Sequence, residues 1–401
     1  MTIGIIREGK NPPDKRVPLT PEQCIQIQDN FECKVIVQPS AIRAYSDKEY
    51  SDLGLTISED MSQCDVLLGV KEVPKADLLP KKKYFFFSHT YKKQSYNRDL
   101  LQEVLDKNIQ LIDYEMLTNT RGTRVVAFGR YAGIVGAYNG LRGYGLKTQR
   151  YSLKAAHECR DRVEMNHELD KLNLPENFKI VITGKGRVSS GAIETLKEAG
   201  VKQVEPDEFL LKEFEFPVFT DLTVLHYNER KGGGAVNKVE FYTNPERFDS
   251  SFMKYAKVSN LYIACHFWDH NAPFVFTRED IRNEDFNIEY VADVSCDIDG
   301  PVASTIRPST IAHPFYGYDP ITEKEVAHSA ENSIGVMAVD NLPCELPRDA
   351  SIDFGRDLID HVIPHLFNDD PDKVIWRASE TQNGKLTPHF AYLQAYVNGE
   401  E

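Results

Sequence analysis

The chain has 401 residues, of which 41% are hydrophobic and 27% charged, and its formal net charge at pH 7 is −14. This length is sufficient for two domains with separate cores, and the composition is typical of a globular protein without low-complexity tracts. The negative charge argues against nucleic acid or an anionic membrane as the main partner.

Seven cysteines are scattered along the chain without CxxC spacing. An odd number of unclustered thiols is typical of a reducing compartment and predicts neither a metal site nor a disulfide framework. The first residues, MTIGIIREGK, indicate a strand rather than a signal peptide, and no apolar run approaches the length of a membrane span. We therefore expect a cytoplasmic protein.

Residues 1–115 alternate short apolar runs with amphipathic or polar segments. Asn97–Lys107 carries leucine and valine at helical spacing and predicts a helix. Strands separated by helices predict a parallel α/β sheet that forms a domain of its own. The predicted strands are Ile3–Ile6, Lys34–Gln38, Val66–Val70, Tyr84–Ser88 and Ile109–Asp113.

A glycine-rich segment, Val125–Gly145, follows this region. Gly129, Gly133, Gly136 and Gly140 recur at steps of three and four residues, so small side chains would line one face of a helix. Such a face packs closely on another element, and we expect this helix to join and brace two domains. The alternative is a glycine-rich surface loop.

The segment Phe178–Gly200 combines an apolar run, a glycine turn and a helical pattern. Gly184 allows a sharp turn, and Gly186 lets the backbone approach a pyrophosphate. The helix beginning near Ser190 would direct N–H groups at that phosphate. This order is typical of the first βα unit of a dinucleotide-binding fold, although Ser189 replaces the third glycine of the usual pattern.

An acidic residue about twenty positions beyond such glycines binds the ribose hydroxyls of NAD. Glu205 is the better placed candidate, with Asp207 behind it; the alternative is a solvated acidic loop. We expect residues 226–257 to be an exposed polar insertion and the chain after a helix at Asp349–Leu366 to be a polar tail. Further strands are predicted at Leu261–Phe267, Tyr290–Ser295 and Gly335–Val339.

Three polar side chains follow predicted strands of the first region. Arg16 offers a planar fork for a carboxylate, Lys71 can act as a base, and His89 suits general acid–base catalysis. Since the carboxyl ends of parallel strands share one edge, these side chains could converge. Each also has a structural interpretation: a surface charge for Arg16, an ion pair with Glu72 for Lys71, and a hydrogen-bonded structural role for His89.

In these segments the chain resembles the lysine-forming saccharopine dehydrogenases and the lysine–2-oxoglutarate reductase half of bifunctional lysine-degrading enzymes. Alanine dehydrogenase and the nucleotide-binding component of transhydrogenase are more distant relatives. The chain ends near residue 401, so we expect the glutamate-forming half of the bifunctional enzymes to be absent. The resemblance is carried by KRVPLTPEQ (15–23), LLGVKEVP (67–74), YFFFSHTYKKQ (84–94), LIDYEMLTNTRGTRVVAFGRYAG (111–133), TGKGRVSSGA (183–192), VEPDEF (204–209), YVADVSCDIDG (290–300), AHPFYGYD (312–319) and MAVDNLPCELPRDAS (337–351).

The resemblance implies that Lys71 is the catalytic base and His89 the general acid. It also implies substrate binding by Arg16, Gln94 and Phe128. Fungal members carry a second arginine where this chain has Thr123, which leaves open how the second substrate carboxylate is held. Together, the glycine motif and the resemblance predict the cofactor-binding residues Arg124, Gly184, Gly186, Arg187, Glu205, Phe267, Asp340 and Asn341.

We predict an α/β fold of two Rossmann-like domains with parallel sheets separated by a cleft. Residues 1–136, completed by 341–401, would form the substrate (catalytic) domain, and residues 137–340 the dinucleotide-binding domain.

The implied function is NAD(P)-dependent interconversion of saccharopine with L-lysine and 2-oxoglutarate, by hydride transfer at a CH–NH bond. Glu205 favours NAD, whereas the bifunctional relatives are expected to use NADP. The alternatives are an alanine- or opine-type dehydrogenase and a non-catalytic nucleotide-binding regulator. The expected partners are small amino acids and 2-oxo acids, and the expected assembly is a monomer or small homo-oligomer.

Overall fold

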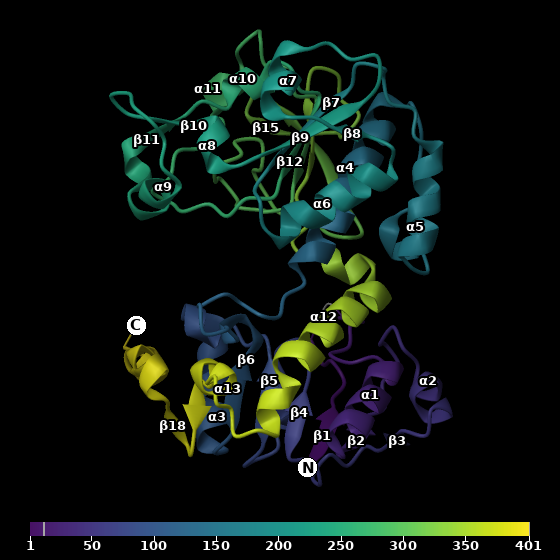
Figure 1. Cartoon of the computed structure of the whole chain (residues 1–401), viewed down its shortest axis with the longest axis vertical. Helices are drawn as coiled ribbons and strands as arrows, with labels where there is room; N and C mark the ends of the chain where they lie inside the picture. Colours follow the sequence, from purple (N-terminus) through teal and green to yellow (C-terminus); the bar gives the residue numbers. More distant parts are fainter. Residues whose placement is uncertain (11–12, 401) are drawn as a thin grey trace. The chain divides into compact units, whose positions relative to one another are not determined.

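Runs of β-branched and aromatic residues form two separate sheets in the computed structural model, which describes residues 1–10 and 13–400 (Figure 1). The chain divides into two compact units. Unit 1 comprises Met1–Phe128 and Pro347–Glu401, and unit 2 comprises Gly129–Leu346. The sequence analysis predicted the boundaries between the two domains at 136/137 and 340/341.

The sheet of unit 1 has six strands in the order β3-β2-β1-β4-β5-β6, and all of its neighbours are parallel. All five strands predicted in this region are confirmed, and β3 is an additional short edge strand. The strands are β1 (Thr2–Ile5), β2 (Lys34–Val37), β3 (Thr56–Ile57), β4 (Val66–Leu68), β5 (Lys83–Phe86) and β6 (Gln110–Asp113).

Alternate residues of these strands belong to two different apolar clusters, because successive side chains of a strand point to opposite faces. Phe85 joins a cluster with Cys24 of α1 (Pro21–Phe31) and Phe354 of α12 (Pro347–His361). Its neighbours Tyr84 and Phe86 join a cluster with Val104 of α3 (Arg98–Asp106). Helices therefore cover both faces of the sheet.

The segment after α12 is folded, so the prediction of a polar tail is wrong. Phe390, Leu393 and Tyr396 recur every three residues and are buried together with Leu101 of α3. This spacing places three apolar side chains on one helical face within an otherwise polar sequence. The remaining helices and strands of unit 1 are α2 (Asp47–Asp52), α13 (Val374–Ala378), β17 (Thr381–Gln382), β18 (Lys385–Leu386) and α14 (Gln394–Asn398).

The sheet of unit 2 has eight strands in the order β15-β14-β16-β13-β12-β7-β9-β8. The strands from β16 to β8 run parallel, and β14 and β15 add an antiparallel edge. Together the two sheets confirm the predicted α/β class with parallel sheets. The strands are β7 (Lys179–Thr183), β8 (Lys202–Gln203), β9 (Val218–Leu222), β12 (Leu261–Ala264), β13 (Tyr290–Asp293), β14 (Phe315–Asp319), β15 (Lys324–Val326) and β16 (Ile334–Met337).

The predicted glycine-rich helix is α4 (Gly129–Thr148), which starts four residues later than the segment in which it was predicted. A Cβ atom added to Gly133 would lie 1.7 Å from the Val188 carbonyl oxygen, and one added to Gly191 would lie 1.9 Å from the Arg130 carbonyl oxygen. The backbones of α4 and α6 (Arg187–Glu198) therefore touch within unit 2. Burial of the helix offsets the poor helix propensity of its glycines.

Residues 226–257 are not an exposed insertion, contrary to the prediction. A hairpin of β10 (Asn228–Arg230) and β11 (Phe248–Ser250) leads into the unit 2 core, where Tyr227, Phe241 and Phe252 are buried. The longest exposed stretch is its glycine-rich tip, residues 229–235. The remaining helices are α5 (Arg162–Glu168), α7 (Pro206–Leu211), α8 (Val224–Tyr227), α9 (Lys238–Thr243), α10 (Met253–Ala256) and α11 (Arg278–Ile281).

Within the described ranges, no helix combines the length and the apolar character needed to span a membrane.

Candidate active site and dinucleotide pocket

Polar side chains gather in unit 1 where parallel strands end. Lys71 and Glu72 follow β4, and His89 follows the neighbouring strand β5. Glu8 follows β1, which pairs with the other side of β4. Because these carboxyl ends lie at one edge of the sheet, the predicted base and acid belong to the same edge.

His89 is hydrogen-bonded to Glu72, with 2.8 Å between Nδ1 and Oε1. The other carboxylate oxygen of Glu72 accepts a hydrogen bond from Lys10 Nζ, also at 2.8 Å. Burial would raise the pKa of Glu72, but the hydrogen bonds from His89 and Lys10 outweigh burial and lower it to about 2. The ionised carboxylate therefore holds the proton on Nδ1, and no other described residue hydrogen-bonds Nε2.

Lys71 does not pair with Glu72, so the structural interpretation of this lysine as the partner of Glu72 is wrong. Its backbone N–H donates to Glu8 Oε2 at 2.8 Å, and the Val70 N–H donates to Glu8 Oε1 at 2.7 Å. Across residues 1–10 and 13–400, no side chain hydrogen-bonds or ion-pairs with Lys71 Nζ. Burial, followed by the charge of Asp14, raises the pKa of Glu8 to about 8.

Arg16 and Phe128 lie together, as expected of two substrate-binding residues. The Arg16 guanidinium lies 4.1 Å from the Phe128 ring centroid, and Phe128 in turn stacks on Phe354. Arg16 is buried, and its Nε and Nη2 donate to Asp14 at 3.0 and 2.6 Å. A substrate carboxylate would therefore have to share this guanidinium with Asp14.

Gln94 and Arg124 each contact residues that the sequence prediction did not name. Gln94 accepts hydrogen bonds from the hydroxyls of Tyr96 and Tyr396, each at 2.5 Å, through its side-chain and backbone oxygens respectively. Arg124 lies 3.4 Å from Glu115 and belongs to unit 1, whereas the other predicted cofactor residues all belong to unit 2. Glu115, which sequence reasoning missed, also forms an ion pair with Lys92 at 2.9 Å.

In unit 2, the glycine turn after β7 has the form expected of a phosphate-binding loop. Gly184 has φ +108°, and an added Cβ would lie 2.5 Å from the Cys265 carbonyl oxygen, so only glycine fits. Gly186 caps α6 without a side-chain hydrogen bond, and a Cβ there would meet nothing within 4 Å. The N-terminus of this 12-residue helix therefore offers its backbone N–H groups to an anion.

A cavity of about 580 Å³ adjoins this turn. Four predicted cofactor residues line it: Gly184, Gly186, Arg187 and Phe267. Lys185 and Lys238 also line it, so three cationic side chains face the cavity together with Asp297. Phe267 is 81% exposed, an unusual state for a large aromatic ring and one that contact with a ligand would relieve.

Glu205, Asp340 and Asn341 do not line this cavity. Glu205 follows β8, the edge strand, and β9 lies between β8 and β7. Instead Asp221, near the end of β9, is buried; it forms an ion pair with Lys185 and accepts a 2.8 Å hydrogen bond from Gln203. The apolar run around Phe219 signals this strand in the sequence, but its place beside β7 is not visible from spacing. Asp340 and Asn341 follow β16, two strands beyond β12.

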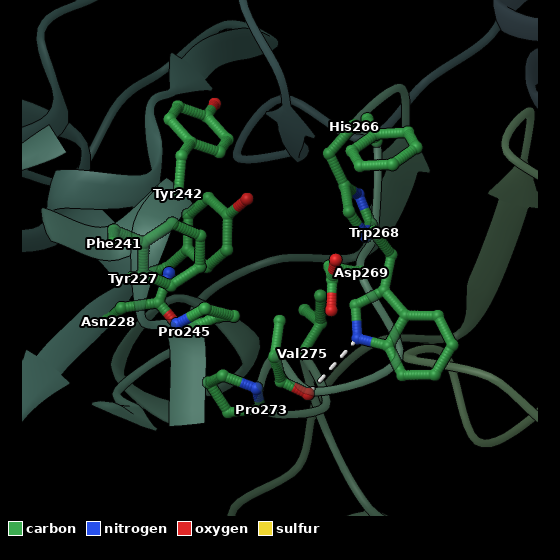
Figure 2. Close-up of a pocket in the computed structure, with 12 residues that line it drawn as sticks. Tyr227, Asn228, Phe241, Tyr242, Pro245, His266, Trp268, Asp269, Pro273 and Val275 are labelled. Carbon is green, nitrogen blue, oxygen red and sulfur yellow. Dashed lines mark hydrogen bonds between the residues drawn. The ribbon is translucent and has the colours of Figure 1, made fainter. Parts of the chain in front are cut away.

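A smaller aromatic pocket of about 50 Å³ adjoins the cavity (Figure 2). Figure 2 shows Tyr227 and Tyr242 on one side and Trp268 on the other, and these residues, with His266, line both spaces. Thr183 Oγ1 lies 2.8 Å from His266 Nδ1, and burial lowers the pKa of His266 to about 4. The buried Nε2 of this neutral ring has no partner among the described residues. This orphaned atom and the open glycine turn both fit a bound nucleotide.

No cluster of three or more His, Cys, Asp or Glu side chains that could hold a metal ion occurs in the part of the chain that the structure describes.

Residues 4–135 match the family described as "Alanine dehydrogenase/PNT, N-terminal domain". The structure of L-alanine dehydrogenase superposes with a TM-score of 0.65, at 16% sequence identity over 100% of both chains. The transhydrogenase from Sinorhizobium meliloti superposes with a TM-score of 0.59, at 12% identity over 96% of this chain and 100% of that one. The chain therefore has a fold like that of L-alanine dehydrogenase and this transhydrogenase.

Sequence relatives narrow the assignment. "Alpha-aminoadipic semialdehyde synthase, mitochondrial" of Mus musculus is 32% identical over 100% of this chain and 48% of that protein, so the chain spans about half its length. "Saccharopine dehydrogenase [NAD(+), L-lysine-forming]" of Candida albicans is 27% identical over 94% of both proteins. The chain is therefore similar to the lysine-forming saccharopine dehydrogenases over almost its entire length, which confirms the resemblance seen in its sequence.

Proposed function

We propose that this chain is an NAD(P)-dependent oxidoreductase that interconverts saccharopine with L-lysine and 2-oxoglutarate. The names of relatives matched over almost the entire chain support this reaction. The observation that carries the proposal is the pairing of His89 Nδ1 with Glu72 at the strand end that also bears Lys71.

The proposed chemistry divides between proton transfers and one hydride transfer. In the oxidative direction, saccharopine loses a hydride from the carbon of its C–N bond, and water adds to the resulting imine to release lysine and 2-oxoglutarate. When bound, the nicotinamide cofactor accepts this hydride, and it returns the hydride in the reverse direction. The protein must therefore move protons at the substrate nitrogen and at the attacking water.

His89 and Lys71 are proposed to move these protons. Glu72 fixes the proton on Nδ1, so His89 exchanges protons with substrate through Nε2. Lys71 Nζ has no ionic partner in the described chain, so it can serve as the second acid–base group. Arg16, stacked on Phe128, is proposed to bind one of the substrate carboxylates in competition with Asp14.

The cofactor is proposed to place its pyrophosphate at the N-terminus of α6. A carboxylate near the adenosine ribose would repel the 2′-phosphate of NADP, but Glu205 is absent from the cavity lining and Asp221 is ion-paired with Lys185. Lys185, Arg187 and Lys238 supply positive charge instead. We therefore propose NADP as the preferred cofactor, which differs from the preference for NAD that the sequence indicated.

Steady-state oxidation of NADH and NADPH tests the proposal. The substrate pairs are lysine with 2-oxoglutarate, ornithine with 2-oxoglutarate, and pyruvate with ammonia. We expect turnover with the first pair and a higher kcat/KM for NADPH. Preference for either other pair would indicate the alternative dehydrogenases, and cofactor binding without turnover on any pair would indicate the regulatory alternative.

A His89→Ala variant tests the assignment of catalysis to unit 1. We expect kcat to fall by a factor of about 10²–10⁴, since a positioned general acid contributes this much. Fluorescence titration should show an unchanged Kd for the reduced cofactor. Loss of cofactor binding in this variant would contradict the role proposed for His89.

A further inference from the structure

The two residues flanking His89 are anchored on a pair of buried carboxyl groups. Ser88 Oγ lies 2.6 Å from Asp113 Oδ2 and 3.0 Å from Glu380 Oε1. Thr90 Oγ1 lies 2.5 Å from Glu380 Oε2 and 2.6 Å from Ser88 Oγ. All four of these side chains are completely buried. The loop that carries His89 is therefore held by hydrogen bonds on both sides of that residue.

His89, which lies between the two anchored residues, has an unusual backbone conformation. His89 has φ +56° and ψ 8°, in the left-handed region that residues other than glycine seldom occupy, although histidine occupies it more often than most. Its backbone N–H donates to Asp113 Oδ2 at 3.3 Å, and Asn97 Nδ2 donates to the Ser88 carbonyl at 3.1 Å. Such a conformation persists only where the surroundings determine it.

The hydrogen bonds among the side-chain oxygens of the two hydroxyls and the two buried acids require more protons than the hydroxyls supply. Four short oxygen–oxygen contacts join Ser88, Thr90, Asp113 and Glu380, whereas the two hydroxyls carry one proton each. With both acids ionised, two of the contacts would bring electron-rich oxygens together without a proton. A proton on one acid satisfies a third contact.

Glu380 is the acid that carries this proton. Asp113 receives backbone N–H groups from Ser88 at 2.8 Å and from Glu115 at 2.7 Å, which stabilise its ionised form. Among the described residues, the carboxyl group of Glu380 hydrogen-bonds only with the two hydroxyls. Burial, followed by the charge of Asp113, raises the pKa of Glu380 above that of an ordinary glutamate.

We propose that Glu380, in its protonated form, is a positioning residue for the reaction: with Asp113 it clamps Ser88 and Thr90, and so holds His89 in the left-handed conformation that directs Nε2 to substrate. The proposal rests on the role of His89 given under Proposed function. Glu380 reaches the loop from the segment after α12, because its backbone N–H donates to the Leu111 carbonyl of β6 at 2.8 Å.

Two substitutions of Glu380 test the clamp in the full-length chain. Glu380→Gln keeps a neutral side chain that donates and accepts hydrogen bonds, so we expect kcat within threefold of wild type. Glu380→Ala removes both anchors, and we expect kcat to fall at least tenfold, with an unchanged KM for the cofactor. Rescue by glutamine but not by alanine is the kinetic signature of a neutral clamp.

A backbone measurement separates this proposal from the reaction itself. In protein labelled with ¹³C-histidine, the ¹³Cα shift of His89, assigned by comparison with His89→Gln, reports its φ angle. We expect the left-handed shift in wild type and Glu380→Gln, and its loss in Glu380→Ala. Since this readout needs no turnover, it tests the clamp even if the proposed reaction fails.

Thr381→Val is the matched control. Thr381 Oγ1 ties the same segment to β6, because it donates to the Ile109 carbonyl at 2.7 Å and accepts from the Leu111 N–H at 3.1 Å, and it hydrogen-bonds neither Ser88 nor Thr90. We expect this variant to keep both the His89 shift and kcat. Wild-type kcat and His89 shift in Glu380→Ala would overturn the proposal, as would equal losses in Thr381→Val and Glu380→Ala.

Discussion

The hydrogen bond between His89 and Glu72 determines which imidazole nitrogen is available for chemistry. An ionised Glu72 accepts the Nδ1 proton, so Nε2 carries the lone pair or the transferable proton. Lys10 holds the second oxygen of the carboxylate and thereby limits its rotation. A histidine without such a partner would populate both tautomers and would be correctly oriented for only part of the time.

Replacement of Glu72 by glutamine should therefore lower kcat by about tenfold to a thousandfold, because the amide permits the wrong tautomer. The cofactor Kd should not change, since Glu72 belongs to unit 1 and the dinucleotide cavity to unit 2. Stopped-flow kinetics and fluorescence titration measure the two quantities. A kcat equal to that of wild type would show that the tautomer of His89 does not matter.

Lys185 has two contacts in unit 2 that bear on cofactor preference. It lines the proposed dinucleotide cavity, and it forms an ion pair with Asp221. Lys185→Ala should lower kcat/KM for NADPH relative to NADH by about tenfold, equivalent to about 1.4 kcal/mol. Steady-state kinetics with both cofactors measure this ratio. Lys197→Ala, an exposed substitution at the far end of α6, is the control and should leave the ratio unchanged. An equal loss for both cofactors would instead place Lys185 at the pyrophosphate.

At the level of secondary-structure elements, the sequence predicted a close packing face on α4, and this face contacts the backbone of α6. Glycines at steps of three and four predicted a small-residue face, and the structure places the backbone of α6 on it at Gly133, whereas Gly136 and Gly140 face the side chains of Val294 and Ala292. The sequence could not identify that second helix, because the contact joins residues more than fifty positions apart. Pairing across such a distance depends on the order of the strands between them.

Gly133→Ala should destabilise the protein by about 1–3 kcal/mol or more, because its Cβ would lie 1.7 Å from a backbone oxygen that cannot move independently. Gly129→Ala on the same helix is the control, since its nearest neighbour would be a Val188 methyl group at an ordinary 3.4 Å. We expect the control to change the unfolding free energy by no more than about 0.5 kcal/mol. Urea denaturation followed by circular dichroism measures both changes, and equal values would contradict the close packing.

At the scale of the whole molecule, the sequence predicted much of the architecture but not its long-range pairings. The strands ending before Lys71 and His89 were predictable because apolar β-branched runs and helical periodicity are local signals. The position of β9 between β7 and β8 was not, so the sequence could not show that the strand before Glu205 is separated from β7, or that Asp221 pairs with Lys185. The roles of Glu72 and Glu380 depend on contacts that span 17 and more than 290 residues.

Glu380 also makes the stability of the whole chain dependent on pH. Burial raises its pKa to about 8 in the folded state, so the unfolded chain releases the proton near the ordinary glutamate pKa of 4.5, well before the folded chain does. Stability from this group is complete below about pH 4.5 and is lost as the pH rises towards 8. The Tm of Glu380→Gln should therefore increase relative to wild type over this range, as measured by thermal denaturation at several pH values.

Thr381→Val again provides the comparison, because valine at this position removes two hydrogen bonds but no titrating group. Its difference in Tm from wild type should stay constant from pH 5 to 8. If the difference for Glu380→Gln were equally constant, the buried carboxyl group would not be the source of the pH dependence.

Unit 1 is interrupted in the chain by the whole of unit 2, and this order has a consequence for biosynthesis. A ribosome that has completed Phe128 must add about 220 further residues, which takes roughly 10–45 s, before Pro347 emerges. During that interval the apolar face destined for α12 has no cover, and the histidine loop lacks its second acidic anchor. A nascent chain would thus complete unit 2 before unit 1 could fold fully, and chaperone capture should be greatest in that window.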